Sequence, residues 1–278
     1  MLAELAEADA KGKIAEIYDE IRHLWAVPYV SSVYKHMATR PGLLEWAWAE
    51  VAPVFRDGST QEAAWRAAAD FRIAELSPVS SYALRVWGVD AQAAATVRGL
   101  CEGFARVSPV NLVFAGLMRR ILAGEAKGGA GTPTATRSWT PPPAVATPPA
   151  MVDPAKLPVD QRAVLMTFGK GVGDTPFVPG LYRMLARWPA LVAHLATVLA
   201  SRIDAPETLA AYDVLRRRLD EVATACLARL QPTATSALPP PDAAERTHLL
   251  AVLDTYRRTS PEMVAFGRLI RDAMPATA

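Results

Sequence analysis

Apolar side chains recur along this chain at helical spacing. Near the N-terminus they lie three or four residues apart, with charged residues between them, at Ile14, Ile17, Tyr18, Ile21, Leu24 and Trp25. Prolines mark the ends of the predicted helices: a helix from about Ser31 ends before Pro41, which opens the next one. No segment alternates apolar and polar residues between turn signals, so we expect no sheet. The chain is predicted to be all-helical.

Two stretches of the chain are nearly identical in pattern. Residues 28–43 read PYVSSVYKHMATRPGL and residues 176–191 read PFVPGLYRMLARWPAL; subtracting 28 from 176 gives an offset of 148. A second pair, 104–117 and 256–269, shares a Ser-Pro step, a Phe and a Leu at an offset of 152. These matches predict two tandem helical repeats that form a pseudo-dimer about a pseudo-twofold axis. We call the surface where the halves meet the seam, and we expect a site there.

A proline-rich segment separates the repeats. Residues 127–150 contain six prolines and three glycines without an apolar period. The chain therefore divides into a first repeat, 1–126, a linker, 127–150, and a second repeat, 151–278. We expect the linker to be an extended strap with few core contacts, because proline-rich chain offers little amphipathic surface to bury.

Charge and composition remove several classes of function. The chain has 278 residues, with 30 basic against 28 acidic residues and a net charge of +2, and no basic run dense enough to follow a phosphate backbone. Nucleic acid is therefore not an expected partner. The N-terminus lacks the apolar centre of a signal peptide and no stretch reaches membrane-spanning length, so we expect a cytoplasmic protein without a membrane partner.

Cysteine and histidine give no metal or thiol motif. Cys101 and Cys226 are not part of a CxxC and are expected to be reduced core residues. The four histidines form no HExxH and have no cysteine at ligand spacing, so no metal is expected. His36 is notable because it lies in the repeated motif, although a surface or core-edge role is its ordinary explanation.

The duplicated aromatic residues are the first candidates for a site. Tyr29 and Phe177 stand five residues before Tyr34 and Tyr182, respectively. Packing in the core explains each of them. As a symmetric set beside the seam they would also line a small apolar pocket, with phenolic hydroxyls as polar handles for substrate.

The candidate catalytic residues are Asp174 and Ser108. Asp174 ends the glycine-rich stretch FGKGVGD just before the second motif. A loop or capping role explains it; the alternative is a general base, because a carboxylate beside an apolar seam is desolvated and its pKa rises. Ser108 precedes Pro109 at a predicted helix start, where it would cap the helix and position a water or a substrate oxygen.

Taken in order, EADAKGKIAEIYDEIR, VPYVSSVYKHMATRPGLLEWAW, the Ser-Pro helix, the proline-rich linker and LYRMLARWPAL resemble the group I 2-haloacid dehalogenases, also called halocarboxylic acid dehydrogenases. The resemblance covers nearly the whole chain. It implies an all-helical pseudo-dimer with a site between its halves. It also implies cofactor-free chemistry, in which an aspartate activates a water that displaces halide from C2 of a 2-haloacid of either hand.

The same resemblance shows a departure at the catalytic positions. The family's water-activating Asp falls on Leu181, which cannot take a proton, and its Asn falls on Ser108. The aromatic residue of the Val-Pro-aromatic-Val motif is kept as Tyr29. We therefore predict that Leu181 lines the substrate site and that Asp174 is the substitute base.

A wider resemblance links the repeat to the alkylhydroperoxidase D-like helical proteins, whose CxxC is absent here. Three hypotheses follow. The chain is a dehalogenase-like hydrolase with Asp174 as base, a non-catalytic binder of small carboxylates that uses Ser108 and the tyrosines, or a partner-binding helical protein that dimerises through its tryptophan-rich helix. A small organic acid is the expected partner in the first two, and a homodimer in the third.

Overall fold

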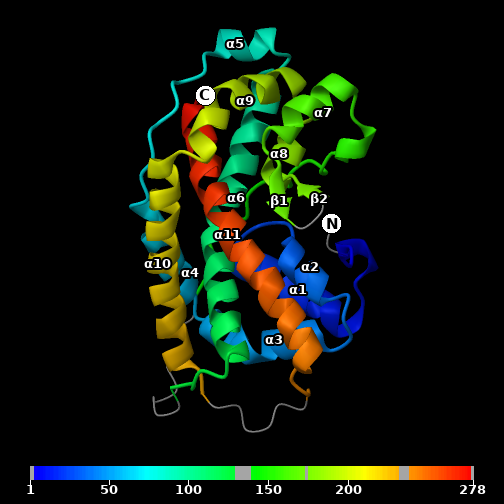
Figure 1. The fold of residues 1–278 in the computed structure, drawn as a ribbon, viewed down its shortest axis with the longest axis vertical. Coiled ribbons are helices and arrows are strands. Elements are labelled where there is room, and N and C mark those ends of the chain that lie inside the picture. The colour runs from blue at the N-terminus through cyan, green and yellow to red at the C-terminus, as the bar shows by residue number, and fades with distance from the viewer. Residues whose placement is uncertain (1–2, 129–138, 173–174, 232–237, 277–278) are drawn as a thin grey trace.

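The computed structural model describes residues 3–128, 139–172, 175–231 and 238–276 (Figure 1). The fold is all-helical, as predicted. In chain order its helices are α1 (Gly12–Trp25), α2 (Ser32–Met37), α3 (Leu43–Val51), α4 (Ser59–Ala69), α5 (Ser81–Val86), α6 (Ala91–Leu122), α7 (Val159–Met166), α8 (Gly180–Leu185), α9 (Pro189–Ile203), α10 (Pro206–Arg229) and α11 (Ala243–Ala273), with 3-10 turns at Glu7–Asp9, Ala52–Val54 and Pro154–Lys156.

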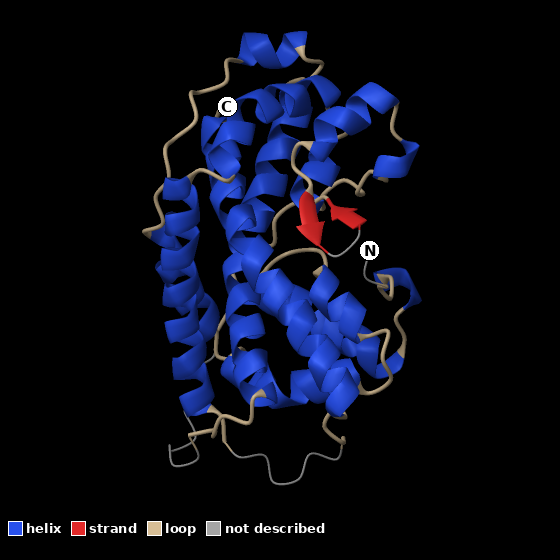
Figure 2. Cartoon of the chain, viewed as in Figure 1, coloured by secondary structure: helices blue, strands red, loops and turns tan. Residues whose placement is uncertain are grey.

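A small hairpin corrects the expectation of no sheet. Strands β1 (Lys170–Val172) and β2 (Thr175–Phe177) pair antiparallel, with Gly171 opposite Pro176. Figure 2 shows the hairpin in red, on the side of the molecule where α7 and α8 lie. Strands of three residues are too short to show an alternating pattern, and a hairpin of this size depends on the helices beside it for its stability.

The two longest helices, α6 and α11, form the centre of the molecule (Figure 1). They approach closely at Gly267 of α11, where a Cβ atom would lie 3.2 Å from the carbonyl oxygen of Cys101 in α6. Both helices continue through a proline, Pro109 in α6 and Pro261 in α11. Because α6 and α11 pack along their lengths, they bring the first and second halves of the chain together.

The prediction that Ser108 starts a helix is wrong. Ser108 is buried in the middle of α6, and the helix begins instead after Asp90, whose side chain accepts a hydrogen bond from the amide of Ala93 at 2.8 Å. A proline inside a helix costs about 3 kcal/mol. The buried apolar positions that α6 carries on both sides of Pro109 offset that cost, so the local signal loses to tertiary packing.

The two halves share part of their order of elements, although α5 occurs only in the first half and the β1–β2 hairpin only in the second. Tyr34 lies on the short helix α2, which is followed by α3, and Tyr182 lies on the short helix α8, which is followed by α9. Each half ends in a long helix with an internal proline. This correspondence supports the predicted tandem repeat, whose superposition about a pseudo-twofold axis stays a prediction.

The second part of the linker packs against the core, against expectation. The Trp139 ring lies beside that of Trp65, tilted by 39° with centroids 6.4 Å apart, and Val145 packs on the same core. Arg106 Nη1 donates a hydrogen bond to the carbonyl oxygen of Pro143 at 2.6 Å. The expectation of few core contacts is therefore wrong for residues 139–150, because Trp139 and Val145 supply the apolar surface that prolines lack.

Two further expectations concern the cysteines and the membrane. Cys101 and Cys226 are buried and carry free thiols, and burial raises the pKa of both. Within the described ranges, the structure has no helix that combines the length and apolar character needed to cross a membrane.

Candidate functional site

A buried carboxylate lies in the second half. Glu262 directly follows Pro261 inside α11 and is 3% exposed. Its Oε1 accepts a hydrogen bond from the Tyr182 hydroxyl at 2.8 Å, and its Oε2 lies 3.0 Å from Lys170 Nζ. Burial raises the pKa of Glu262 above its ordinary value, although Lys170 and Tyr182 act in the opposite direction. A buried carboxylate with a raised pKa and fixed partners is a candidate general base.

The surroundings of Glu262 include an unused hydroxyl. The Tyr212 hydroxyl is buried and has no hydrogen-bond partner among the described residues. Burial, and then the charge of Glu262, raises the pKa of Tyr212. A buried hydroxyl without a partner is rare in proteins, so this one is free to donate to a water or a small ligand. We call Glu262, Tyr182, Lys170 and Tyr212 the Glu262 cluster.

Two further contacts fix this cluster. The ring of Phe168 stacks on that of Tyr182, with centroids 4.0 Å apart and planes 13° from parallel. Lys170 also reaches the exposed Asp204, whose Oδ1 is 3.3 Å from Lys170 Nζ. Lys170, the first residue of the hairpin, therefore connects the buried carboxylate to the surface.

A neutral cluster surrounds Asn111 in the first half and includes Tyr256 of α11. Asn111 on α6 is completely buried, and its Oδ1 accepts hydrogen bonds from Trp25 Nε1 at 2.7 Å and from the Tyr34 hydroxyl at 2.9 Å. Its Nδ2 donates to Ser31 Oγ at 2.8 Å and to the Tyr256 hydroxyl at 2.9 Å. These bonds use both donors and both acceptor positions of the amide. We call these five residues the Asn111 cluster.

The duplicated tyrosines thus have comparable roles. Tyr34 donates to Asn111, two residues after Pro109, and Tyr182 donates to Glu262, one residue after Pro261. These two hydrogen bonds connect both tyrosine-bearing helices to the central helices α6 and α11, whereas the place of the tyrosines beside a symmetric seam stays a prediction. Their hydroxyls are already engaged, so they are not simple open handles for substrate.

Tyr29 has a free hydroxyl near the Asn111 cluster. Its hydroxyl is buried without a hydrogen-bond partner among the described residues. Burial, and then Tyr256, raises the pKa of Tyr29. Its ring lies beside Phe104, with centroids 6.4 Å apart, and a Cβ atom on Gly103 would lie 3.5 Å from its hydroxyl. The first half therefore also holds one unused donor.

The remaining predicted site residues are scattered. Leu181 is fully buried at the start of α8, next to Tyr182, whereas Phe177 on β2 is 38% exposed. Ser108 is buried inside α6 and is not at a helix terminus. Asp174 lies outside the described residues. Ser108, Leu181 and Phe177 thus lie on three different elements, and Phe177 is opposite Lys170 of the Glu262 cluster in the hairpin.

Sequence analysis did not find Glu262, Asn111, Lys170, Tyr212 or Tyr256. A usable signal was present, since Asn111 and Glu262 both follow the duplicated Ser-Pro step within three residues of its serine. That step was interpreted as a cap, so the polar residues after it were not considered. Over the part of the chain that the structure describes, no group of three or more His, Cys, Asp and Glu side chains could hold a metal ion.

With this fold and these clusters, the chain is similar to the 2-haloacid dehalogenases. A curated (R)-2-haloacid dehalogenase of Pseudomonas putida is 26% identical over 235 residues, which are 79% of this chain and 75% of that protein. No family model matches the chain.

Solved structures give the same result for the fold. D-2-haloacid dehalogenase in complex with L-LA matches with a TM-score of 0.69 at 19% identity, over 99% of this chain and 95% of that one. A D-2-haloacid dehalogenase mutant in complex with D-2-CPA matches with a TM-score of 0.68 at 18% identity, over 100% and 96% of the two chains. The predicted resemblance is therefore confirmed.

Proposed function

We propose that this protein is a hydrolase that removes halide from short 2-halocarboxylic acids, with Glu262 as its base. One observation carries the proposal: a buried carboxylate with a raised pKa touches the tyrosine next to Leu181. Leu181 is the position where the resemblance places the family's aspartate. Similarity to an (R)-2-haloacid dehalogenase over most of the chain supports the substrate class.

The proposed reaction is a direct displacement. A water held by Glu262 attacks C2 of the haloacid, the carbon–halogen bond breaks, and its electron pair leaves with the halide. The water proton passes to the Glu262 carboxylate. Because burial raises the pKa of Glu262, this carboxylate is a stronger base than an exposed one.

The neighbours of Glu262 have separate roles in this proposal. Tyr182 and Lys170 each donate to one carboxylate oxygen, which fixes the group and leaves an acceptor position on each oxygen for water. The unused Tyr212 hydroxyl donates to the substrate. Leu181 contributes an apolar contact for the substrate carbon chain, and Tyr29 offers a second free hydroxyl from the first half.

Asp174 is the competing base, because its carboxylate directly precedes the second motif in the sequence. Halide release from both enantiomers of 2-chloropropionate, measured for wild type, Glu262→Gln and Asp174→Asn, separates the two. We expect wild type to act on the R enantiomer, in keeping with the names of the relatives. Glu262→Gln should lower kcat by about 100-fold or more, as loss of a general base does, and Asp174→Asn should retain activity.

A matched control is Glu207→Gln on α10, which removes an exposed carboxylate and should leave turnover unchanged. Loss of turnover in Asp174→Asn with full activity in Glu262→Gln would assign the base to Asp174 instead. No halide release by wild type from a panel of short 2-haloacids would overturn the hydrolase proposal. A rise in Tm with the same acids would then support the non-catalytic carboxylate binder.

A further inference from the structure

A second, separate site is suggested by a groove on the surface of α10 and α11. The groove has a volume of about 390 Å³ and is lined by charged side chains, namely Asp213, Arg216, Arg217 and Asp220 of α10 and Asp254, Arg257 and Arg258 of α11. We call it the arginine groove. None of the residues of the Glu262 cluster lines it.

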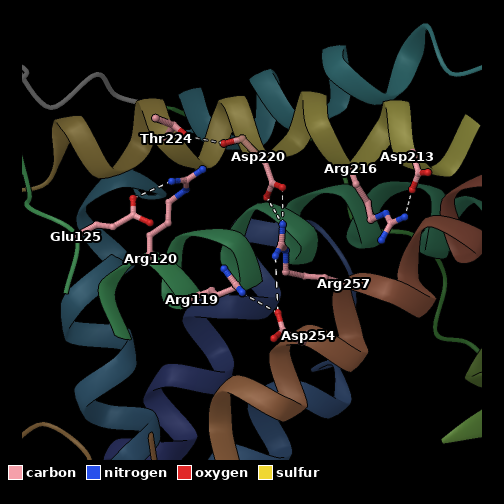
Figure 3. Close-up of polar contacts among 9 residues, drawn as sticks. All are labelled: Arg119, Arg120, Glu125, Asp213, Arg216, Asp220, Thr224, Asp254 and Arg257. Atoms are coloured by element: carbon pink, nitrogen blue, oxygen red, sulfur yellow. Dashed lines mark hydrogen bonds and ion pairs between the residues drawn. The ribbon is translucent and has the colours of Figure 1, made fainter. Parts of the chain in front are cut away.

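Ion pairs occupy all three aspartates of the groove (Figure 3). Arg257 Nη2 donates to Asp220 Oδ1 at 2.6 Å, and this pair joins α11 to α10. Asp254 accepts from Arg119 Nε of α6 at 2.7 Å.

Arg216 pairs with the third aspartate, Asp213, one turn before it on α10. The acidic side chains of the groove are therefore already neutralised by fixed partners.

Two arginines of the groove have no such partner. Arg217 and Arg258 are exposed, and their side chains make no hydrogen bond or ion pair with any described residue. The lining contains four arginines and three aspartates, which leaves a net charge of +1, and Arg119, paired to Asp254, adds another positive charge beside it. An excess of fixed positive charge in a concave surface attracts anions.

We propose that the arginine groove binds a small oxyanion with two or more negative charges, of the phosphate class, through Arg217 and Arg258. A guanidinium matches the oxygens of phosphate with two parallel N–H donors, and Arg257, fixed by Asp220, presents a further positive charge that is already ordered. The volume suits one small molecule rather than a polymer. This inference does not rest on the proposed hydrolase activity.

Thermal unfolding and calorimetric titration with inorganic phosphate and with glycerol 3-phosphate test the proposal, at an ionic strength held constant with KCl. At ten times its Kd, either anion should raise Tm by about 3 °C. The double variant Arg217→Gln/Arg258→Gln should lose this shift while it keeps the wild-type Tm without anion, because both side chains are exposed and unpaired. Arg246→Gln, an exposed arginine of α11 outside the groove, is the matched control.

The two anions also identify the source of the ligand. Tighter binding of glycerol 3-phosphate indicates an organic phosphate, and equal binding indicates free phosphate. The proposal would be overturned if neither anion raises Tm at about 10 mM, a concentration at which even a weak site would be occupied. The proposal would also fail if Arg246→Gln lost phosphate binding as fully as the double variant. It would fail too if a polyanion such as heparin bound more tightly than phosphate and still bound to the double variant.

Discussion

Tyr34 and Tyr182 occupy equivalent places in the two repeated motifs, yet one donates to a buried amide and the other to a buried carboxylate. In the Asn111 cluster every hydrogen-bonding position of the amide is used. In the Glu262 cluster the Tyr212 hydroxyl is unused. A saturated neutral network stabilises a fold, whereas a buried carboxylate costs free energy and is retained at functional sites.

The largest effect on stability should come from Asn111→Leu. The change leaves the Trp25 indole and the Tyr34 hydroxyl buried without an acceptor, and it also removes the donor to Ser31 and Tyr256. Each buried group without a partner costs about 1–3 kcal/mol, so we expect a loss of about 3–5 kcal/mol in the free energy of unfolding, measured by urea denaturation.

Glu262→Gln is the matched change in the other cluster. A glutamine still accepts a hydrogen bond from Tyr182, so its loss of stability should be less than half that of Asn111→Leu. An equal or larger loss in Glu262→Gln would show that the carboxylate, too, has mainly a structural role.

Helical periodicity predicted the helical fold correctly. The repeat gave Tyr34 and Tyr182 equivalent positions in the sequence, and each hydroxyl bonds to a buried polar side chain of a long central helix. The helix start predicted at Ser108 was wrong, because the effect of Pro109 is local while α6 gains buried contacts along its 32 residues. The expectation that the linker makes few core contacts failed for a similar reason, because the apolar ring of Trp139 packs on the core despite the prolines around it.

The candidate site was harder to predict because its partners are remote in the chain. Glu262 lies 80 residues after Tyr182, so no local pattern relates the two. Asp174 was selected because it is near Leu181 in sequence, whereas a base is defined by distance in space. A single sequence shows which motif is duplicated; it does not show which side chain on α11 each copy touches.

Tyr182→Phe should lower the free energy of unfolding about twice as much as Tyr34→Phe. Loss of the Tyr34 hydroxyl costs about 1 kcal/mol, because Asn111 Oδ1 keeps its bond from Trp25. Loss of the Tyr182 hydroxyl removes a bond to a charged acceptor, which is worth about 2 kcal/mol. Denaturation of both variants under one condition provides the comparison, and the reverse order would contradict the assignment of charge to Glu262.

The pH dependence should also separate the clusters. The pKa of Glu262 is raised above 4.5, so its contribution to stability is fully present below 4.5 and is lost as pH rises through the raised value. The stability difference between wild type and Glu262→Gln should therefore change over that range, by about 1.4 kcal/mol for each unit of upward shift. The effect of Asn111→Leu should stay constant there, since an amide does not titrate. A constant difference for both variants would mean that Glu262 is not perturbed in solution.

A third polar contact joins α2 to α11, and it should respond to acid in the opposite direction. His36 Nε2 lies 3.0 Å from His248 Nε2, and His36 Nδ1 lies 2.9 Å from the carbonyl oxygen of Ala3. Because that carbonyl can only accept, His36 carries its proton on Nδ1, and its Nε2 accepts from His248. If both imidazole rings are protonated on both nitrogens, neither Nε2 can accept a hydrogen bond, and this contact is lost.

The smallest effect is expected from His248→Gln. Desolvation, His36 and Arg40 lower the pKa of His248, while Glu245 acts against them. Because the pKa of His248 is lowered in the folded state, the stability that its neutral side chain contributes is fully present above about pH 6.5. It is lost as pH falls through the folded-state pKa. Glutamine does not titrate, so from pH 7.5 to 5.5 wild type should lose up to about 1 kcal/mol relative to the variant, a small value because His248 is partly exposed.

The control for this last measurement is His23→Gln, the same substitution at an exposed histidine outside this pair. If His248→Gln keeps the wild-type slope of stability against pH, the pair contributes nothing to the acid response. If it flattens the slope, α11 carries two contacts whose contributions to stability change with pH in opposite directions. The carboxylate of Glu262 would then favour the fold in acid and the His36–His248 pair would favour it above neutrality, while the Asn111 cluster between them holds the halves together at every pH.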